Sequence, residues 1–149
     1  MRAVVQRVAD AEVVVDGEVV GQIDGGLLLY VGAAPDDGPA DVTWLAEKIA
    51  GLRVFPDADG KINLDVSQAG GRVLAVPAFT TQADARKGRR PSFDRAAPPD
   101  VAQPLYEAFC DALTAAGVGV DRGVFRAHMH VRSTNDGPIC ILLDSKRAF

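Results

Sequence analysis

The sequence has few of the features that mark secreted or membrane-bound proteins. Only two of its 149 residues are cysteine, Cys110 and Cys140, and they lack the Cys-x-x-Cys spacing of a zinc site or redox pair, so we expect reduced thiols. No apolar run approaches the ~20 residues that cross a bilayer. Charged residues interrupt the first twelve positions, where a secretory signal needs an apolar centre. We therefore expect a cytoplasmic protein with no membrane segment.

The chain also lacks the excess of basic residues that draws a protein to nucleic acid through its overall field. Sixteen Lys and Arg stand against twenty Asp and Glu, a net charge of -4, so any polyanion must be held by a local patch. The 48% of hydrophobic and 24% of charged residues are ordinary for a globular protein. The length suits one core, and we expect a single domain over residues 1–149.

Apolar periodicity predicts an α+β domain. A mostly antiparallel sheet or barrel of about seven short strands is expected, with two main helices. One helix starts at Pro39, and the other starts near Asp100 or Pro104 and ends at Gly117. The expected strands cover residues 1–8, 12–15, 18–23, 27–31, 73–79, 125–131 and 139–143, and Asp16-Gly17 is a two-residue hairpin turn.

Two histidines stand out in the expected strand 125–131, where apolar and polar residues alternate. His128 and His130 would share one face, roughly 7 Å apart at ~3.3 Å per residue, a separation that two ligands of one metal ion tolerate. No further His, Cys or acidic residue has a recognisable ligand spacing. We therefore expect a solvated polar face and no metal.

A long loop is predicted between residues 80 and 99, because this stretch has no periodicity. It carries the basic residues Arg86, Lys87, Arg89 and Arg90, and four cations within five residues can contact a nucleic-acid backbone without reading bases. The alternative is a charged loop that only aids solubility. Loops of this length are usually functional.

Two features near the C-terminus are candidates for chemistry. Asn135-Asp136-Gly137-Pro138 is a dense turn cluster, expected between two strands. Cys140 follows it and would be a nucleophile if a histidine lay within reach, although an idle cysteine is the commoner case.

These residues together resemble the D-aminoacyl-tRNA deacylases of bacteria and eukaryotes, almost end to end. The matching motifs are Met1-Arg2-Ala3-Val4-Val5-Gln6-Arg7-Val8, Leu52-Arg53-Val54-Phe55, Asp59-Gly60-Lys61-Ile62-Asn63, Ala83-Asp84, Lys87-Gly88-Arg89-Arg90-Pro91-Ser92-Phe93 and Asn135-Asp136-Gly137-Pro138. The resemblance implies a homodimer without a cofactor, which hydrolyses the ester of a D-amino acid, or of glycine mischarged on tRNA-Ala, with the terminal adenosine of tRNA.

The resemblance also implies a role for each of the candidate site residues. Gly137-Pro138, in cis, would enter the partner's pocket, hold the substrate's α-amino group with its carbonyls and exclude L side chains. Backbone N–H groups of Phe79 and Thr80 would assist hydrolysis together with a ribose hydroxyl of the tRNA. Pro77, Ala78 and Cys140 would line the pocket, and Arg86, Lys87, Arg89 and Arg90 would meet tRNA phosphates.

The chain departs from the family pattern at several of these places. Pro77 and Ala78 replace Ser and Gln, Cys140 replaces Thr, and His128 stands where an acid is expected. Pro77 has no backbone N–H, and Ala78 has no side-chain amide to orient water or substrate. We expect an active deacylase, with two alternatives: an altered substrate choice, or a non-catalytic relative that binds tRNA or DNA.

Overall fold

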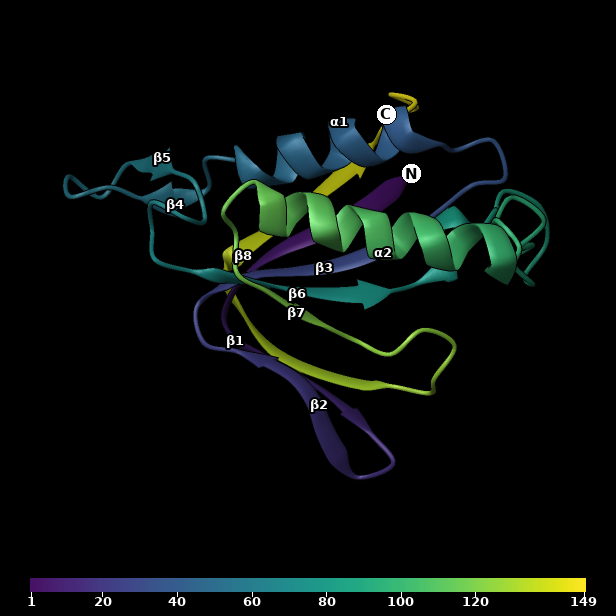
Figure 1. Cartoon of the computed structure of the whole chain (residues 1–149), viewed down its shortest axis with the longest axis horizontal. Coiled ribbons are helices and arrows are strands. Elements are labelled where there is room, and N and C mark those ends of the chain that lie inside the picture. Colours follow the sequence, from purple (N-terminus) through teal and green to yellow (C-terminus); the bar gives the residue numbers. More distant parts are fainter.

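The structure is a computed structural model that describes residues 1–149, and its main feature is a curved, mixed sheet around one long strand. That strand, β1, pairs antiparallel with β2, β3 and β8, while β6 lies parallel to β3 and β7 parallel to β6. The six strands are β1 (Arg2–Val15), β2 (Glu18–Ile23), β3 (Gly26–Gly32), β6 (Arg72–Pro77), β7 (Val120–Arg122) and β8 (His130–Asp144). This arrangement confirms the α+β class (Figure 1).

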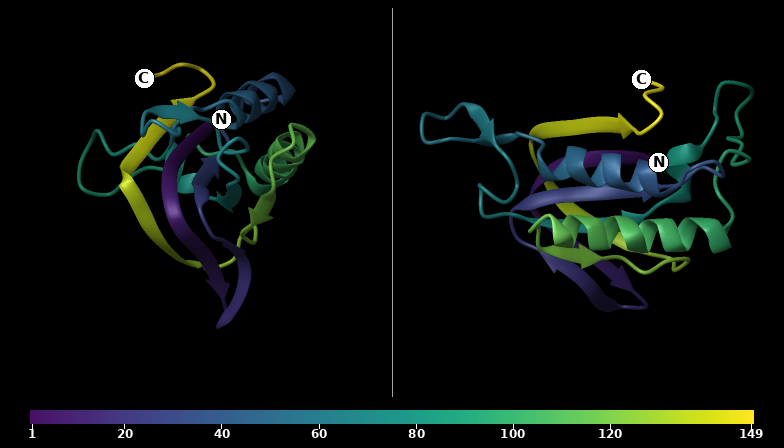
Figure 2. Two further views of the ribbon diagram at one scale, coloured as in Figure 1. Left: turned by 90° about the vertical axis from the view of Figure 1, so that its left-hand side faces the viewer. Right: turned by 45° about the horizontal axis from the view of Figure 1, so that its top comes forward.

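Two helices, α1 (Pro39–Ala50) and α2 (Pro99–Ala115), cover one face of the sheet side by side (Figures 1 and 2). Each begins with a proline, whose missing N–H costs nothing in a first helical turn. The second helix starts at Pro99, and Pro104 lies inside it. Neither helix has the length and apolar sequence needed to cross a membrane.

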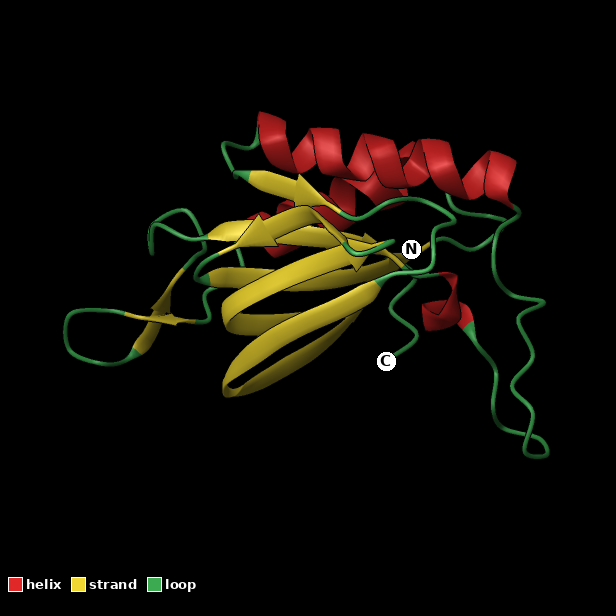
Figure 3. Ribbon diagram, turned by 90° about the horizontal axis from the view of Figure 1, so that it is seen from below, coloured by secondary structure: helices red, strands yellow, loops and turns green.

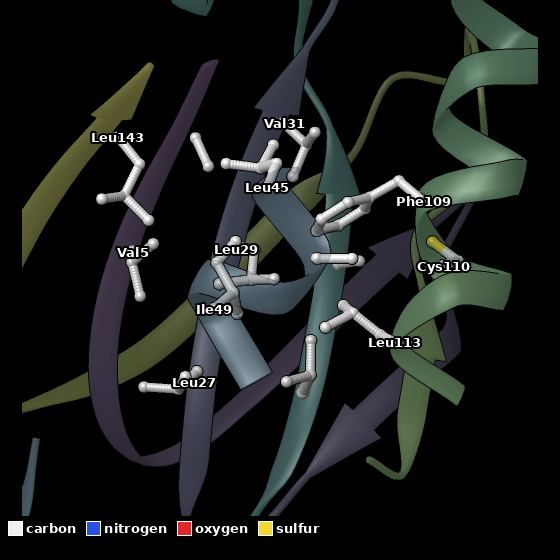
Figure 4. Close-up of a cluster of buried hydrophobic side chains, with 14 of the residues drawn as sticks. Val5, Leu27, Leu29, Val31, Leu45, Ile49, Phe109, Cys110, Leu113 and Leu143 are labelled. Carbon is white, nitrogen blue, oxygen red and sulfur yellow. The ribbon is translucent and has the colours of Figure 1, made fainter. Parts of the chain in front are cut away.

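The core lies between these helices and the sheet. Figure 4 shows side chains of β3, α1 and α2 meeting there, among them Leu29, Ile49 and Phe109. A smaller cluster that includes Leu28 and Val13 packs on the other face of the sheet. Because neighbouring residues of a strand point to opposite faces, β3 contributes to both clusters, which explains its uninterrupted apolar sequence.

A short hairpin and a long loop project from opposite ends of the molecule (Figure 1). The hairpin consists of β4 (Phe55–Pro56) and β5 (Ile62–Leu64). The predicted loop after β6 is confirmed, and it opens with a 3-10 turn, η1 (Phe79–Gln82), visible in Figure 3. The Asp16-Gly17 hairpin is confirmed as well, with both φ angles positive, at 49° and 81°.

The expected turn at residues 135–138 is wrong, because these residues lie within the continuous strand β8. Between the pairs Gln6–Cys140 and Val8–Asn135, β8 advances five residues while β1 advances two. The strand takes up its turn-forming residues as a bulge against its neighbour. Likewise, residues 1–8 and 12–15 belong to a single strand, β1.

The strand expected over residues 125–131 is also wrong for most of its length. β8 begins only at His130, and the residues before it are irregular, with Arg126 at a φ of 63°. Phe125 and Met129 are half-buried, whereas Arg126 and His128 are exposed. The alternation in sequence therefore reflects alternate burial in a loop rather than a strand.

Candidate functional site

An apolar pocket of about 750 Å³ opens at the end of the sheet where β3 and β6 finish. Of its 22 lining residues, 16 are hydrophobic. They come from the N-terminus, the ends of β3 and β6, the loop that follows β6, the first half of α2, and the segment that leads into β8. The volume lies in the range of ~300–1,000 Å³ typical of small-ligand sites.

Residues 77–80 form one wall of this pocket, and hydrogen bonds tie that wall to β3. The Ala78 N–H donates to the Val31 carbonyl at 2.8 Å. The Thr81 N–H and hydroxyl donate to the Ala78 carbonyl at 3.2 and 3.0 Å. The buried side-chain amide of Gln82 donates to the Gly32 carbonyl at 3.0 Å. The wall is therefore a fixed piece of backbone.

Two backbone amides of this wall are not used by the turn itself. The first hydrogen bond of η1 comes from Thr81, so the N–H groups of Phe79 and Thr80 precede it, as the first donors of any helix do. Phe79 is 56% exposed, and its ring meets Phe93 edge-on with centroids 5.1 Å apart. Amides beside an exposed aromatic ring suit a ligand with a flat ring and a developing negative charge.

Gly137-Pro138, the other half of the predicted site, does not line the pocket. Its peptide bond is cis, and both residues are exposed. Arg7 holds the segment: its Nε donates to the Asp136 carbonyl at 3.2 Å and pairs with the Asp136 carboxylate at 3.1 Å, while Nη1 donates to the Val54 carbonyl at 2.7 Å. The Asn135 amide donates to the carbonyls of Arg7 and Ile139, both at 2.9 Å.

The strand register shows how far apart the two halves lie within one chain. Arg2 pairs with Gly32 at the pocket, whereas Val8 pairs with Gly26 and Asn135. Six residues at ~3.3 Å each separate these positions by roughly 20 Å. Gly137-Pro138 is therefore at the end of the sheet near the β4–β5 hairpin, away from its own chain's pocket.

Cys140 is exposed and outside the pocket. Its sulfur accepts one hydrogen bond, from the Gln6 side-chain amide at 3.8 Å. No histidine is a hydrogen-bond partner of Cys140; the rings of His128 and His130 pack against each other, with centroids 5.1 Å apart. A thiol nucleophile needs an adjacent base, and the described chain offers Cys140 none.

The two histidines also find no third ligand. No group of three or more His, Cys, Asp or Glu residues is arranged to hold a metal ion. His128 lines the pocket.

In the loop over residues 86–90, one cation is paired and three are free. Hydrogen bonds from Arg86 lower the pKa of Asp84 well below its usual value, with Arg95 adding to the effect. Lys87, Arg89 and Arg90 are exposed and have no carboxylate partner. These three can meet phosphates without first breaking an ion pair.

Comparison with known proteins identifies the family of the chain. The family described as "D-Tyr-tRNA(Tyr) deacylase" matches residues 4–144. The D-aminoacyl-tRNA deacylases of Anaeromyxobacter dehalogenans and Thermotoga petrophila are 57% and 54% identical, over all 149 residues and the whole of each relative. The chain belongs to the D-aminoacyl-tRNA deacylase family. The protein is therefore an ester hydrolase of the deacylase type.

A solved structure of this fold belongs to the c-Myc DNA unwinding element binding protein. It is 35% identical, with a TM-score of 0.91, and the match covers 97% of this chain and 98% of that one. A protein of this fold has thus been named for binding DNA.

Sequence reasoning missed two residues that shape this pocket. Gly32 is one, since a Cβ there would lie 2.6 Å from the Ala78 carbonyl oxygen. Tyr106 is another, lining the pocket while its hydroxyl donates to the Ala75 carbonyl at 2.8 Å. A glycine that ends an apolar strand was the available signal for Gly32, but nothing local marked Tyr106.

Proposed function

We propose that the protein hydrolyses the ester of D-aminoacyl-tRNA, and of glycine mischarged on tRNA-Ala, in the cytoplasm. We propose further that it acts as a homodimer in which Gly137-Pro138 of one copy completes the pocket of the other. The observation that carries this proposal is the separation of the two halves: a pocket wall with free amides at one end of the chain, and an exposed, braced Gly137-Pro138 at the other.

The pocket suits the terminal adenosine of tRNA, with its base on the ring of Phe79. Water attacks the ester carbonyl carbon, and the amides of Phe79 and Thr80 donate to the oxyanion that forms. The ester C–O bond then breaks, the ribose oxygen takes a proton, and a free amino acid leaves. A preorganised donor of this kind lowers the activation barrier by ~2.7–4 kcal/mol. A ribose hydroxyl of the substrate positions the water.

Stereochemical choice rests on exclusion by backbone. The carbonyls of Gly137-Pro138 hold the substrate's α-amino group, and an L side chain collides with this segment whereas a D side chain or glycine does not. The bracing by Arg7 and Asn135 supports this role, because an excluding surface must not yield.

Two features of β8 support pairing of two copies. The strand pairs only with β1, which leaves its outer edge open, and an open edge is a template for another chain. Leu142 on this strand is 56% exposed.

The departures at Pro77, Ala78 and Cys140 shift substrate choice in this proposal. Pro77 and Ala78 line the pocket without offering a side-chain hydrogen bond. The donors that remain are main-chain groups, so catalysis depends on the backbone of Phe79 and Thr80. Cys140, two residues after Pro138, lines the pocket of the partner copy.

The first experiment measures release of amino acid from D-Tyr-tRNA, Gly-tRNA-Ala and L-Tyr-tRNA. We expect hydrolysis of the first two and none of the third. Retained tRNA or DNA binding with no release from any of them would support the non-catalytic alternative. Cys140→Ala should change KM and the order of substrate preference but keep most of kcat, since the proposed route forms no bond to sulfur. Loss of kcat on every substrate with intact folding would favour a thiol nucleophile.

A second experiment tests the sharing of sites between copies. Thr80→Pro removes one amide of the pocket wall, and Gly137→Ala disturbs the excluding segment, since its Cβ would lie 2.9 Å from the Ile139 nitrogen. Co-expressed chains carrying one change each should form mixed dimers that regain D-selective hydrolysis, because one pocket and the segment facing it are both intact. Without recovery, the halves act within one chain and the shared site is wrong.

A third experiment concerns the basic loop. Replacing Lys87, Arg89 and Arg90 by Gln should weaken tRNA binding and make it less dependent on salt, since each lost phosphate contact lowers the slope of log K against log salt by about 0.9. Arg132→Gln is the control, because Arg132 is exposed but paired with Glu12. Equal binding by the triple variant and the parent would contradict the role of the loop.

A further inference from the structure

Two basic side chains, Arg126 and His128, form the rim of the otherwise mostly apolar pocket. Among the 22 lining residues, Arg126 and His128 are the only members of the Arg, Lys, His, Asp and Glu group. Both come from the irregular segment before β8, and both are exposed, while Phe125 and Met129 on either side of them are half-buried. Arg126 thus places a positive charge, and His128 an imidazole, where the pocket meets solvent, and the lining contains no acidic residue.

Neither side chain forms a hydrogen bond or an ion pair within the chain. Arg126 takes part in no ion pair, whereas the nearby Arg122 and Arg132 are paired with Asp111 and Glu12. His128 contacts the ring of His130, edge to face, and no carboxylate. A guanidinium and an imidazole are therefore left free for an outside ligand.

The backbone adds a second, independent observation. Arg126 has a φ of 63°, in the left-handed region that residues with a side chain seldom adopt. Such conformations cluster at ligand-binding sites, where the surrounding structure maintains them.

We propose that Arg126 and His128 bind the phosphate on the 5′ side of the substrate's terminal adenosine. This inference rests on the proposed function, because it takes the adenosine to occupy the pocket. A polynucleotide whose last nucleoside is inside must leave through the opening, which brings that phosphate to the rim. A guanidinium fits phosphate oxygens in bidentate fashion, and a ring N–H of histidine adds a donor.

The rim has a different task from the basic loop. The loop meets phosphates of the tRNA body, whereas Arg126 and His128 read a single phosphodiester next to the reacting ester. They are specificity-determining residues: they favour the end of a nucleic acid over a free nucleoside ester. Because the phosphate is bound alike before and during hydrolysis, its contribution falls on KM rather than kcat.

The test uses two small esters, D-tyrosyl adenosine and D-tyrosyl adenosine 5′-(methyl phosphate), the second of which carries a phosphodiester. For the parent protein the phosphate should lower KM about tenfold at unchanged kcat. Arg126→Gln and His128→Gln should each remove most of this advantage, while Arg126→Lys keeps part of it. His128→Asp should make the phosphate unfavourable. Arg132→Gln, which changes an exposed arginine outside the pocket, should behave as the parent.

Binding measurements keep this inference separate from the proposed function. Calorimetry with adenosine and with adenosine 5′-(methyl phosphate), neither of which carries an ester to hydrolyse, should give a Kd about tenfold lower for the phosphate in the parent and equal values in Arg126→Gln. Equal Kd values in the parent would overturn the role of the rim. A clear phosphate preference without hydrolysis of either ester would instead support the rim and overturn the proposed function.

Discussion

The turn at Phe79–Gln82 and the bulged segment of β8 around Gly137 are both stretches of irregular backbone with exposed residues, yet they differ in what they face. The turn is bonded to the end of β3 and borders a cavity of its own chain. The bulge is held just as firmly, by Arg7 and Asn135, but borders no cavity of that chain. Firm support without a local ligand site is typical of a surface that acts on another molecule.

Under the proposed function, rate and selectivity depend on different segments and should be lost separately. Displacing the turn would remove the donors that we propose act on the ester, so hydrolysis should slow for every substrate. Loosening the bulge leaves those donors in place, so hydrolysis should continue with poorer discrimination between D and L substrates.

Gly32→Ala should break the turn and give the largest effect. The new Cβ would lie 2.6 Å from the Ala78 carbonyl oxygen and against the Thr81 hydroxyl, so the wall that carries both amides must shift. We expect kcat/KM to fall about a hundredfold, the loss typical of one misplaced oxyanion donor. Gly38→Ala is the matched control, because a Cβ there meets nothing within 4 Å. Equal rates in the two variants would show that the wall is not catalytic.

Arg7→Ala should break the other side of the comparison. It removes contacts to Asp136 and Val54, and hydrogen bonds to charged groups contribute ~1.5–3 kcal/mol. We expect the ratio of D-Tyr-tRNA to L-Tyr-tRNA hydrolysis to fall about tenfold, with the rate on D-Tyr-tRNA changed much less. If both rates fell together, the bulge would be part of the rate-determining machinery.

Asp41→Asn tests the support behind the pocket. Ser145 accepts from the Met1 amino group at 2.5 Å and donates to Asp41 at 2.6 Å, and Met1 lines the pocket. Burial would raise the pKa of Asp41, but hydrogen bonds from Ser145, Gly38 and Lys146 outweigh it and lower the pKa to about 2.

A pKa below its unfolded value stabilises the fold above about pH 4, and that stabilisation disappears as the pH falls towards 2. Asp41→Asn should therefore lower the free energy of unfolding by about 2 kcal/mol at pH 7 and by little near pH 2. Urea unfolding of both proteins across this range checks the sign. A constant difference at all pH values would assign the loss to packing.

Tyr106→Phe should give the smallest effect. Its hydroxyl donates to the Ala75 carbonyl at 2.8 Å, and burial raises the pKa of Tyr106, so the donor is present at all accessible pH values. Losing one such bond costs about 1 kcal/mol, or ~2–4 °C in Tm for a chain of this size. Thermal unfolding checks this value, and a larger shift would show that α2 depends on this one contact.

Local patterns in the sequence were enough for the helices and for most strands. The proline starts, the stripe through Leu45 and Ile49, and the Asp16-Gly17 hairpin all act within a few residues. The errors arose where tertiary pairing overrode local preference. Residues 135–138 have turn composition, but β8 pairs with β1 on both sides of Gly137-Pro138, so the segment becomes a bulge within one strand. The loop around Arg126 resembles a strand in sequence because alternate side chains are half-buried.

The sequence predicted which residues belong to the candidate site, but not where they lie relative to one another in the fold. The resemblance named Phe79, Thr80, Gly137 and Pro138, and the fold brings the first two to the pocket and takes the last two to the far end. Periodicity carries no information on such distances. Gly32 and Arg126 owe their importance to contacts and backbone angles, which appear only once the chain is folded.

The remoteness of Gly137-Pro138 from its own chain's pocket has a quantitative consequence. Under the proposed arrangement, a solitary copy carries hydrolytic amides with no stereochemical filter in front of them. Dilution below the dissociation constant of the dimer would then lower the selectivity for D substrates before it lowers the rate of hydrolysis. The cell's protection of L-aminoacyl-tRNA would depend on how much of this protein it makes.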